Sequence, residues 1–470
     1  MLKAVDVPRQ SIASLEPVVG EERFAELTRA AGEFRQRLAG RAIWNVSSTA
    51  LGGGVAEMLE VLVGYVRDLG VAIHWSVITG DAEFFAVTKR VHNHLHGDGT
   101  GGPFTQADDD HYREVLAANA AELAGLVRPG DLVLLHDPQT AGLTESVLGL
   151  GASAVWRCHI GVDWQNDATR SGWDFLWPYL ADAQRYVFTR REYAPSWMPN
   201  KKVAVIPPSI DPASPKNQDL GTDTVPAILT TIGVLRGTAP DTPPAFTRRD
   251  GTMGVVTRPA TIVGEGRPGP GDQVVVQVSR WDRLKDMAGV MRGFADYVAP
   301  SRQAFLLLVG PAVAEVTDDP EGAAVYQECL AQWQQLPSAV RASTLLVTLP
   351  LDDVDENAAM VNALQRHAAV VTQKSLAEGF GLTVAEAMWK ARPVVGSAVG
   401  GIIDQIAPGT GILLSDPHDL AEFGAALCRL LDDPAEANRM GQAAQAHVRA
   451  CYVGDLHLLR YANLFSSLIS

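Results

Sequence analysis

Short runs of β-branched and aliphatic residues alternate with amphipathic helical patterns along most of this chain. Such alternation is typical of βαβ units, which build parallel sheets. The pattern stops near Pro207 and resumes at Gln273. The sequence therefore predicts an α/β protein with two Rossmann-like, doubly wound parallel sheets. The strand-like runs are RAIWNVSS, VAIHWSVITG, DLVLLHD, SAVWRCHI, RYVFT and KVAVIPPS, then QVVVQVS, AFLLLVG, STLLVTL, AAVVTQ and RPVVGS.

The segments outside this alternation complete the expected domain organisation. Pro and Gly make up about 28% of residues 211–270 but about 15% of the whole chain, which is typical of a loop-rich insertion or linker. The predicted order is a helical N-terminal extension (1–40), an N-terminal Rossmann-like domain (41–210), the insertion or linker (211–270), a C-terminal Rossmann-like domain (271–450) and a C-terminal helix that crosses back to the N-terminal domain (451–470).

Composition excludes several classes of protein. The formal net charge of −15 argues against a nucleic-acid or membrane-surface binder, because both partners are polyanionic. Four cysteines, none close to another in sequence, favour reduced thiols in a cytoplasmic protein over a disulfide scaffold. We expect no signal peptide, because the N-terminus (MLKAVDVPRQ) has no apolar run behind a basic start. We expect no membrane span, because no stretch approaches eighteen apolar residues.

Two related halves predict a ligand cleft, because open parallel sheets bind ligands beyond the carboxyl ends of their strands. The first candidate is the glycine run of SSTALGGGVAE, which follows a strand and precedes a helix. Gly53 and Gly54 let the backbone approach an anion or a hydroxyl group. A plain tight turn explains the run equally well.

Two cations follow the first strand of the second half, in SRWDRLKD. Arg280 and Lys285 lie five positions apart on one loop, where a guanidinium fork and an ammonium point charge can hold a diphosphate. The alternative is a solvated charged loop.

The most specific element is EGFGLTVAEAMW, with carboxylates at Glu378 and Glu386. A glycine-rich turn that enters a helix is an anion cradle, and a carboxylate can accept hydrogen bonds from two vicinal hydroxyl groups. Two alternatives stay open: Glu378 is a surface loop acid, and Glu386 closes a capping box with Thr383. The residues between the carboxylates that we expect to bind ligand are Gly379, Phe380, Gly381, Leu382 and Thr383.

Histidines offer weaker candidates. His159 follows a strand and would point into the cleft, although a hydrogen-bonded core histidine is also consistent with this position. His92, His94 and His96 lack a supporting acid or cysteine cluster, so we predict no metal site. The acidic run 108–110 precedes a helix and is interpreted as complementing its dipole.

Together these stretches resemble the retaining GT-B glycosyltransferases of family 4, and most closely their trehalose glycosyltransferring synthases. The resemblance covers about residues 41–465. The segments that carry it are SSTALGGGVAEML, EFFAVTKRVHNHLHG, WRCHI, VIPPSIDPASPKN, VSRWDRLKD, LVGPAVAEVTDDPEG and EGFGLTVAEAMWKARPVVGSAVGGIIDQI.

The resemblance implies that domain 41–210 binds the acceptor and that domain 271–450 binds the nucleotide-sugar donor. It also implies a role for each candidate. Arg280 and Lys285 would neutralise the diphosphate of a nucleoside diphosphate sugar, and Glu378 would hold sugar hydroxyls. Glu386 would bind the ribose. The backbone from Gly379 to Thr383 would contact sugar and phosphate, Gly53 and Gly54 would face the phosphate and the acceptor, and His159 would lie near the transferred sugar. The resemblance implies no cofactor and no metal, and it implies a homodimer.

The resemblance also implies the activity, which is retaining transfer of a glucosyl-type group to a sugar acceptor such as glucose, giving trehalose. One departure concerns the acceptor: the acid that usually follows WRCHI is replaced by Gly161, with Asp163 two positions on. Two alternatives therefore stay open. One is a (pseudo)glycosyltransferase that couples an activated sugar or carbocycle to a specialised metabolite; the other is a non-catalytic sugar-nucleotide binding protein.

Overall fold

The computed structural model describes residues 2–50, 54–237, 241–312 and 320–469. The chain forms two compact units, the first from Met1–Ser209 with Gly454–Ser470 and the second from Ile210–Val453. Each unit contains a seven-stranded sheet whose strands are parallel except for one at an edge. The predicted α/β class with two doubly wound sheets is confirmed.

The first sheet has the strand order β1-β3-β2-β4-β5-β6-β7, with β1 antiparallel to β3. All five residues of β4 are buried, as expected for a parallel sheet covered on both faces. The strands are β1 (Lys3–Ala4), β2 (Ile43–Ser47), β3 (Ile73–Val77), β4 (Leu132–His136), β5 (Ser153–Cys158), β6 (Arg185–Phe188) and β7 (Val203–Val205).

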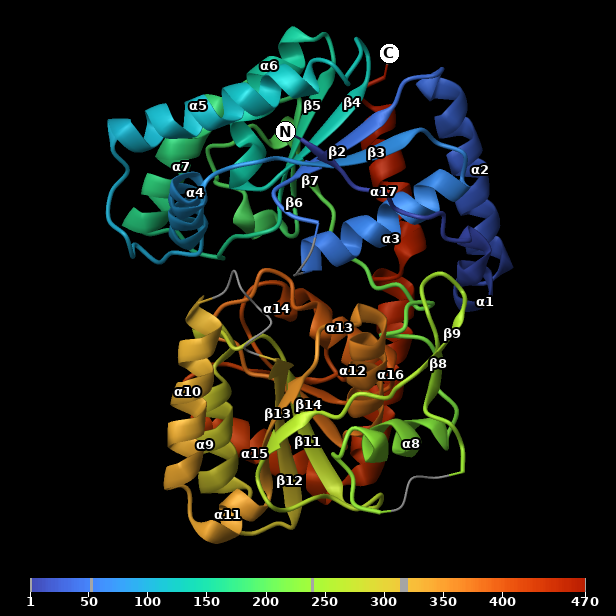
Figure 1. Ribbon diagram of the computed structural model, residues 1–470, viewed down its shortest axis with the longest axis vertical. Helices are drawn as coiled ribbons and strands as arrows, with labels where there is room; N and C mark the ends of the chain where they lie inside the picture. Colours follow the sequence, from blue (N-terminus) through green and yellow to red (C-terminus); the bar gives the residue numbers. More distant parts are fainter. Residues whose placement is uncertain (1, 51–53, 238–240, 313–319, 470) are drawn as a thin grey trace. The chain divides into compact units, whose positions relative to one another are not determined.

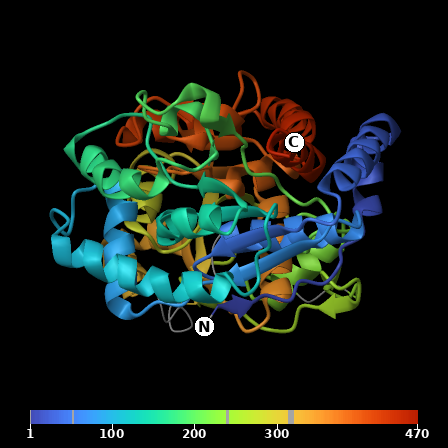
Figure 2. The same cartoon turned by 90° about the horizontal axis from the view of Figure 1, so that it is seen from above.

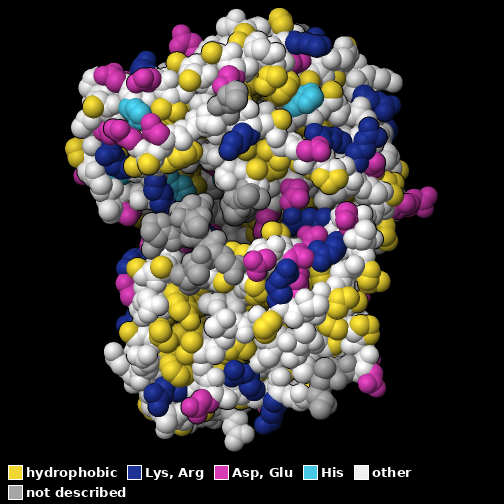
Figure 3. Space-filling view, in the orientation of Figure 1, with side chains coloured by type: hydrophobic (Ala, Val, Ile, Leu, Met, Phe, Trp, Pro, Cys, Tyr) yellow, Lys and Arg dark blue, Asp and Glu magenta, His cyan; other side chains and the backbone are white. Residues whose placement is uncertain are grey.

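Several helices of this unit begin at capping side chains. Asp81 accepts a hydrogen bond from the backbone of Phe84, and Thr105 forms a capping box with Asp108. Acidic, basic and histidine side chains lie together over α4 and α5 (Figure 3). The helices are η1 (Ile12–Leu15), α1 (Glu16–Val19), α2 (Glu21–Leu38), α3 (Gly54–Asp68), α4 (Ala82–Leu95), α5 (Gln106–Leu123), η2 (Pro138–Leu143), α6 (Thr144–Gly149), α7 (Asp167–Leu180), η3 (Arg191–Tyr193), η4 (Asn200–Lys202) and α17 (Gly454–Ser466).

The first and last long helices of the chain, α2 and α17, pack side by side in this unit (Figures 1 and 2). Arg23 on α2 donates to both carboxylate oxygens of Asp455 on α17, at 2.8 and 2.9 Å, and the Asp455 side chain is fully buried. The rings of Phe34 and Phe465 stack at 6.3 Å. The two ends of the chain therefore form one layer of the first unit.

The second sheet has the strand order β10-β13-β12-β11-β14-β15-β16, with β10 antiparallel to β13. A separate hairpin pairs β8 with β9. The strands are β8 (Ala245–Thr247), β9 (Met253–Val255), β10 (Thr261–Val263), β11 (Gln273–Val278), β12 (Ala304–Pro311), β13 (Thr344–Leu349), β14 (Val370–Gln373), β15 (Val394–Ser397) and β16 (Ile412–Leu414).

Helices cover both faces of the second sheet: α9, α10 and α15 lie on one side and α12 and α13 on the other, while α16 packs on both α13 and α15 (Figure 1). The helices of this unit are α8 (Thr224–Thr231), η5 (Arg283–Lys285), α9 (Met287–Tyr297), α10 (Pro320–Gln335), α11 (Ser338–Ala342), α12 (Val354–His367), α13 (Leu382–Trp389), α14 (Gly401–Gln405), α15 (Leu420–Asp432) and α16 (Pro434–Cys451).

The strand orders locate a switch point in each sheet, where ligands of doubly wound proteins bind. In the second sheet, chain order reverses between β11 and β14, so the loops at 279–286 and 374–381 leave from this point. In the first sheet the corresponding loops follow β2 and β4.

Two predicted segments differ from the structure. Residues 1–40 are not a separate extension, because β1 pairs with β3 and α2 packs on α17. Residues 211–270 are not simply an insertion or linker, because they contribute α8, β8, β9 and the edge strand β10 to the second unit. Their proline and glycine content reflects the turns between these short elements. Residues 451–470 contain the end of α16 and then α17, which belongs to the first unit.

Candidate functional site

The two switch-point loops of the second unit are tied together by a fully buried glutamine on β11. Gln277 donates from Nε2 to the carbonyl of Lys285 at 2.7 Å, and its Oε1 accepts from the backbone of Lys374 at 3.2 Å. The backbone N–H of Leu376 donates to the carbonyl of Leu284 at 2.7 Å. The loop that carries the predicted cations and the loop that carries Glu378 therefore form one connected structure.

Lys285 and Glu378, ninety-three positions apart in sequence, form an ion pair within this structure. Nζ of Lys285 donates to Oε2 of Glu378 at 2.6 Å, and Ser375 donates to the same oxygen at 3.3 Å. Both charged side chains are mostly buried. Arg280 lies on the same loop as Lys285, is 58% exposed and lies 3.4 Å from Asp282. The structure thus brings Lys285 and Glu378 into contact, and Arg280 lies on the loop that carries Lys285.

A buried ion pair between Lys374 and Asp286 joins the same two loops. Nζ of the fully buried Lys374 pairs with Oδ2 of Asp286, whose Oδ1 caps α9 by accepting from Gly289 at 3.0 Å. Asp286 follows Lys285 directly and has a left-handed backbone, with φ 49° and ψ 45°. This ion pair therefore fixes the direction in which the chain leaves Lys285.

The glycine-rich turn after Glu378 enters α13 through a left-handed glycine. Gly381 is the N-cap residue, with φ 85° and ψ 61°, a conformation that favours glycine. A Cβ at this position would lie 3.2 Å from Cγ of Glu378. Phe380 is buried and packs its ring edge against Tyr452. The backbone from Gly379 to Thr383 thus presents the N-terminus of α13 beside the Lys285–Glu378 pair.

The capping-box alternative for Glu386 is wrong. The helix begins at Leu382 after Gly381, with no side-chain cap, and Thr383 instead donates from Oγ1 to Gln373 at 3.0 Å. Glu386 is 4% exposed, and its Oε2 has no hydrogen-bond partner among the residues that the structure describes. An unsatisfied buried carboxylate oxygen is costly, so a ligand hydroxyl at this point would stabilise it.

In the first unit, a chain of hydrogen-bonded side chains lies at the carboxyl ends of β4 and β5. Because the amide oxygen of Asn45 only accepts, His136 donates to it from Nε2, at 3.1 Å. Nδ1 of His136 then accepts from Nε2 of His159 at 3.0 Å, and Nδ1 of His159 accepts from Arg157 at 3.4 Å. Both ring nitrogens of His159 are therefore engaged by protein, which agrees with the core-histidine alternative.

The pKa values of His136 and His159 indicate that both imidazoles are neutral. Burial, followed by the nearby charge of Arg157, lowers the pKa of His136 to about 3. The same two causes lower the pKa of His159 well below its ordinary value. Neither histidine is suited to act as a general base at neutral pH while this arrangement holds.

Sequence reasoning missed Asp137, which follows β4 at the switch point of the first sheet. Its Oδ1 accepts from the backbone of His159 at 2.8 Å, and burial raises its pKa to about 7. Its backbone has φ 63° and ψ 177°, a region almost restricted to glycine. The available signal was a polar pair at the end of an apolar strand, with His136 as its last residue and Asp137 directly after it.

The remaining candidates of the first unit are less informative. Gly54 is the first residue of α3, and Gly53 lies outside the described residues. A Cβ at Gly161 would come within 2.7 Å of Cγ and Cβ of Tyr193, so this close contact accounts for the glycine. Asp163 is bound by Nη1 of Arg190, at 2.7 and 2.8 Å to its two oxygens.

Neither metal chemistry nor a membrane span is indicated by the part of the chain that the structure describes. His92, His94 and His96 lie on or next to α4, and no group of three or more potential ligands is found among the described residues. In the same residues, no helix is long and apolar enough to cross a membrane.

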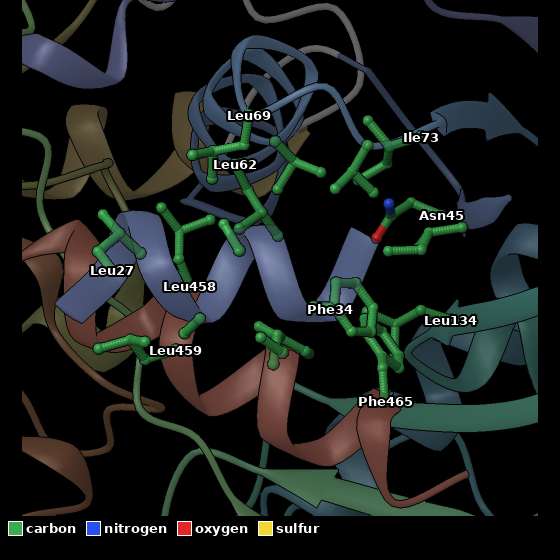
Figure 4. A pocket seen from close by; sticks show the side chains of 17 residues that line it. Leu27, Phe34, Asn45, Leu62, Leu69, Ile73, Leu134, Leu458, Leu459 and Phe465 are labelled. Carbon is green, nitrogen blue, oxygen red and sulfur yellow. The ribbon is translucent and has the colours of Figure 1, made fainter. Parts of the chain in front are cut away.

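A pocket in the first unit lies among α2, α3, α17 and the strands β2 to β4 (Figure 4). Its lining is apolar apart from Asn45 and Tyr461, and it contains no charged side chain. It therefore lacks the groups that bind a diphosphate or several sugar hydroxyls, unlike the Lys285–Glu378 cluster.

Comparison with known families assigns both units. Residues 45–195 match the model of the trehalose synthase N-terminal domain, and residues 264–447 match that of the group 1 glycosyl transferases. Together with the two doubly wound sheets, these matches define the chain as a glycosyltransferase of the GT-B fold.

Individual relatives narrow this class. The trehalose synthase of Rubrobacter xylanophilus is 36% identical over 471 residues, covering 100% of both chains. That of Pyrococcus horikoshii is 33% identical over 461 residues, covering 98% of this chain and 97% of its own. The chain therefore belongs to the trehalose synthase family, and the non-catalytic alternative is set aside.

A solved structure with the same fold is a UDP-forming α,α-trehalose-phosphate synthase from Burkholderia xenovorans, in complex with glucose-6-phosphate. It superimposes with a TM-score of 0.65 at 15% identity, covering 91% of this chain and 100% of its own. At this identity the likeness establishes the fold alone.

Proposed function

We propose that this chain transfers a glucosyl-type group from a nucleoside diphosphate sugar to glucose, with retention of configuration, and forms trehalose. The observation that carries the proposal is the Lys285–Glu378 pair beside the N-terminus of α13, at the switch point of the second sheet. This arrangement offers cations and a helix N-terminus to a diphosphate and a carboxylate to sugar hydroxyls. The names of the trehalose synthase relatives support the choice of product.

The chemical step is mainly a problem of charge. The bond from the anomeric carbon to the diphosphate oxygen breaks, the acceptor oxygen attacks the same face, and the acceptor proton passes to the departing diphosphate. Arg280, Lys285 and the backbone N–H groups at the start of α13 stabilise the charge that develops on this leaving group. Glu378 holds the donor sugar, and we assign no carboxylate as a covalent nucleophile.

The same cations make a divalent metal unnecessary in this proposal, because fixed positive side chains supply the stabilisation that a metal ion supplies elsewhere. Activity that persists unchanged in excess chelator supports this, and loss of activity that Mg²⁺ or Mn²⁺ restores contradicts it.

The four free cysteines support a cytoplasmic location.

The acceptor is assigned to the first unit, where Asp137 and His159 lie at the carboxyl ends of β4 and β5. One observation favours a second acceptor class. Gly161 packs against Tyr193, and Asp163 is bound by Arg190, so neither supplies the acid that usually follows the WRCHI stretch. A specialised metabolite, coupled to an activated sugar or carbocycle, is the alternative acceptor.

A donor and acceptor screen tests the proposal. The protein is incubated with UDP-, ADP-, GDP- and TDP-glucose and with glucose, and the products are identified by mass and linkage. Trehalose with at least one donor supports the proposal. Transfer only to other acceptors supports the second acceptor class, and no transfer from any of these donors contradicts both.

A further inference from the structure

Side chains from α12, α13 and the residue after α13 bind the segment 211–218 of the second unit. Asn362 on α12 is fully buried and donates from Nδ2 to the carbonyls of Pro215 and Gln218, at 3.0 and 2.9 Å. Arg366, one turn further along α12, donates to the Gln218 carbonyl at 2.9 Å. Side chains of one helix, α12, thus bind one carbonyl before Lys216 and one after it.

Asn217, in the same segment, accepts hydrogen bonds from α13 and from the residue that follows this helix. Nε1 of Trp389 donates to the Asn217 carbonyl at 3.1 Å. Nζ of Lys390, a residue only 3% exposed, donates to Oδ1 of Asn217 at 3.0 Å and to the carbonyl of Glu386 at 3.1 Å. The turn is closed internally by the hydrogen bond from Asn217 to the carbonyl of Ser214, at 2.9 Å.

Lys216 is the residue that this arrangement presents. Both of its neighbours are fixed, and its Nζ lies 3.8 Å from Oε1 of Glu386. That separation is longer than a hydrogen bond but short enough for one ligand hydroxyl to contact both groups. The second oxygen of Glu386 is buried and has no partner among the described residues.

We propose that Lys216 is a second ribose-binding residue, which donates to a hydroxyl oxygen of the nucleoside while that hydroxyl donates to Glu386. A hydroxyl group can accept and donate at once, and a carboxylate can accept from both members of a vicinal diol. The Lys216–Glu386 pair is therefore complementary to the 2′ and 3′ hydroxyl groups of a ribose. The inference rests on the proposed function, because it assigns the nucleoside of the same donor.

The experiment measures binding of UDP, ADP and GDP by calorimetry, and then uses the nucleotide that binds most tightly. That nucleotide and its 2′-deoxy and 3′-deoxy analogues are titrated into the wild type, Lys216→Met, Lys216→Arg and Glu386→Gln. Lys201→Met, at an exposed lysine of the first unit, is the matched control. Thermal unfolding shows that each variant is folded.

We expect Lys216→Met to weaken binding of the intact nucleotide by roughly tenfold to a hundredfold, the range for a hydrogen bond to a charged group. For the deoxy analogue that lacks the contacted hydroxyl, the loss should shrink to about twofold. Lys216→Arg should keep most of the affinity, and Lys201→Met should keep all of it.

Two results overturn the inference and are distinguishable. If Lys216→Met weakens all three ligands equally, or weakens none, Lys216 does not contact the ribose, whereas the proposed function stands. If the folded wild type binds none of UDP, ADP and GDP, this inference fails. If it binds no TDP either, the proposed donor site fails as well.

Discussion

Oδ1 of Asp137 accepts a hydrogen bond from the backbone N–H of His159 at 2.8 Å, and so joins the carboxyl ends of β4 and β5. To make this contact, Asp137 keeps a backbone conformation, φ 63° and ψ 177°, that is almost restricted to glycine. Such a conformation costs roughly 1–3 kcal/mol in a residue with a Cβ. Strain of this kind is often found at functional sites, which favours a role for Asp137 in acceptor binding.

The strain at Asp137 predicts an unusual order of stability for two variants. Asp137→Gly and Asp137→Ala both remove the carboxylate, but only the alanine keeps a Cβ at positive φ. We expect the glycine variant to be more stable than the alanine variant by about 1 kcal/mol or more, measured by denaturant unfolding. At Asp110, exposed on α5, the order should reverse, because glycine weakens helices. An alanine variant at least as stable as the glycine variant at Asp137 would contradict the strain.

Burial of Asp137 also predicts how stability depends on pH. Its pKa is raised from 3.8 to about 7, so the folded state binds more protons than the unfolded state between these values. The stabilising contribution is complete below about pH 4 and is lost as pH rises through about 7, by an amount on the order of 1.4 kcal/mol per unit of raised pKa. The unfolding free energy of the wild type, relative to Asp137→Asn, should therefore fall between pH 4 and pH 7. A difference that stays constant, or rises, would show that Asp137 has an ordinary or lowered pKa.

The leaving-group assignment predicts different kinetic effects for Arg280 and Glu386. Arg280→Ala should lower kcat by about 10²–10³, the cost of one preorganised charge-stabilising donor. Glu386→Gln should mainly raise the donor KM, because a ribose contact stabilises ground and transition states alike. Arg429→Ala is the control, since Arg429 is similarly exposed and also paired with an acid, Glu436. Equal small effects at Arg280 and Glu386 would count against the assignment.

The buried pair beneath Lys285 predicts a stability cycle. Lys374→Met leaves Asp286 without its cation and should cost about 3–5 kcal/mol of unfolding free energy. Adding Asp286→Asn, which keeps a cap for α9 and tolerates the left-handed backbone, should recover much of that loss. Denaturant unfolding of the single and double variants measures the coupling. Additive losses would mean that the two side chains act independently.

Much of the candidate site in the second unit could be predicted from sequence, because its chemistry lies in short local motifs. The EGFGLTVAEAMW element predicts a glycine turn followed by a helix, with two carboxylates. The structure places them where the strand order reverses. The direct pairing of Lys285 with Glu378 could not be predicted, because ninety-three residues separate them and only the β11–β14 register brings their loops together.

Other features depended on backbone geometry that residue types do not reveal. Thr383 and Glu386 have capping-box spacing, yet the N-cap is the left-handed Gly381, two residues before Thr383, and Thr383 donates to Gln373 instead. The positive φ of Asp137 leaves no sequence signal, because aspartate rarely adopts it. The composition of segment 211–218 predicts only a loop-rich linker, because the side chains that fix it lie more than 140 positions away on α12 and α13.

The anomeric configuration of the first product distinguishes retaining from inverting transfer at the proposed nucleotide-sugar site of the second unit. An α-linked nucleoside diphosphate glucose that supports turnover is mixed with glucose, and the new glycosidic linkage is followed by proton NMR from the earliest time points. We expect a non-reducing disaccharide in which the transferred glucose is α-linked. A β-linked first product would contradict retention, and release of the nucleotide without any new glycosidic bond would contradict transfer.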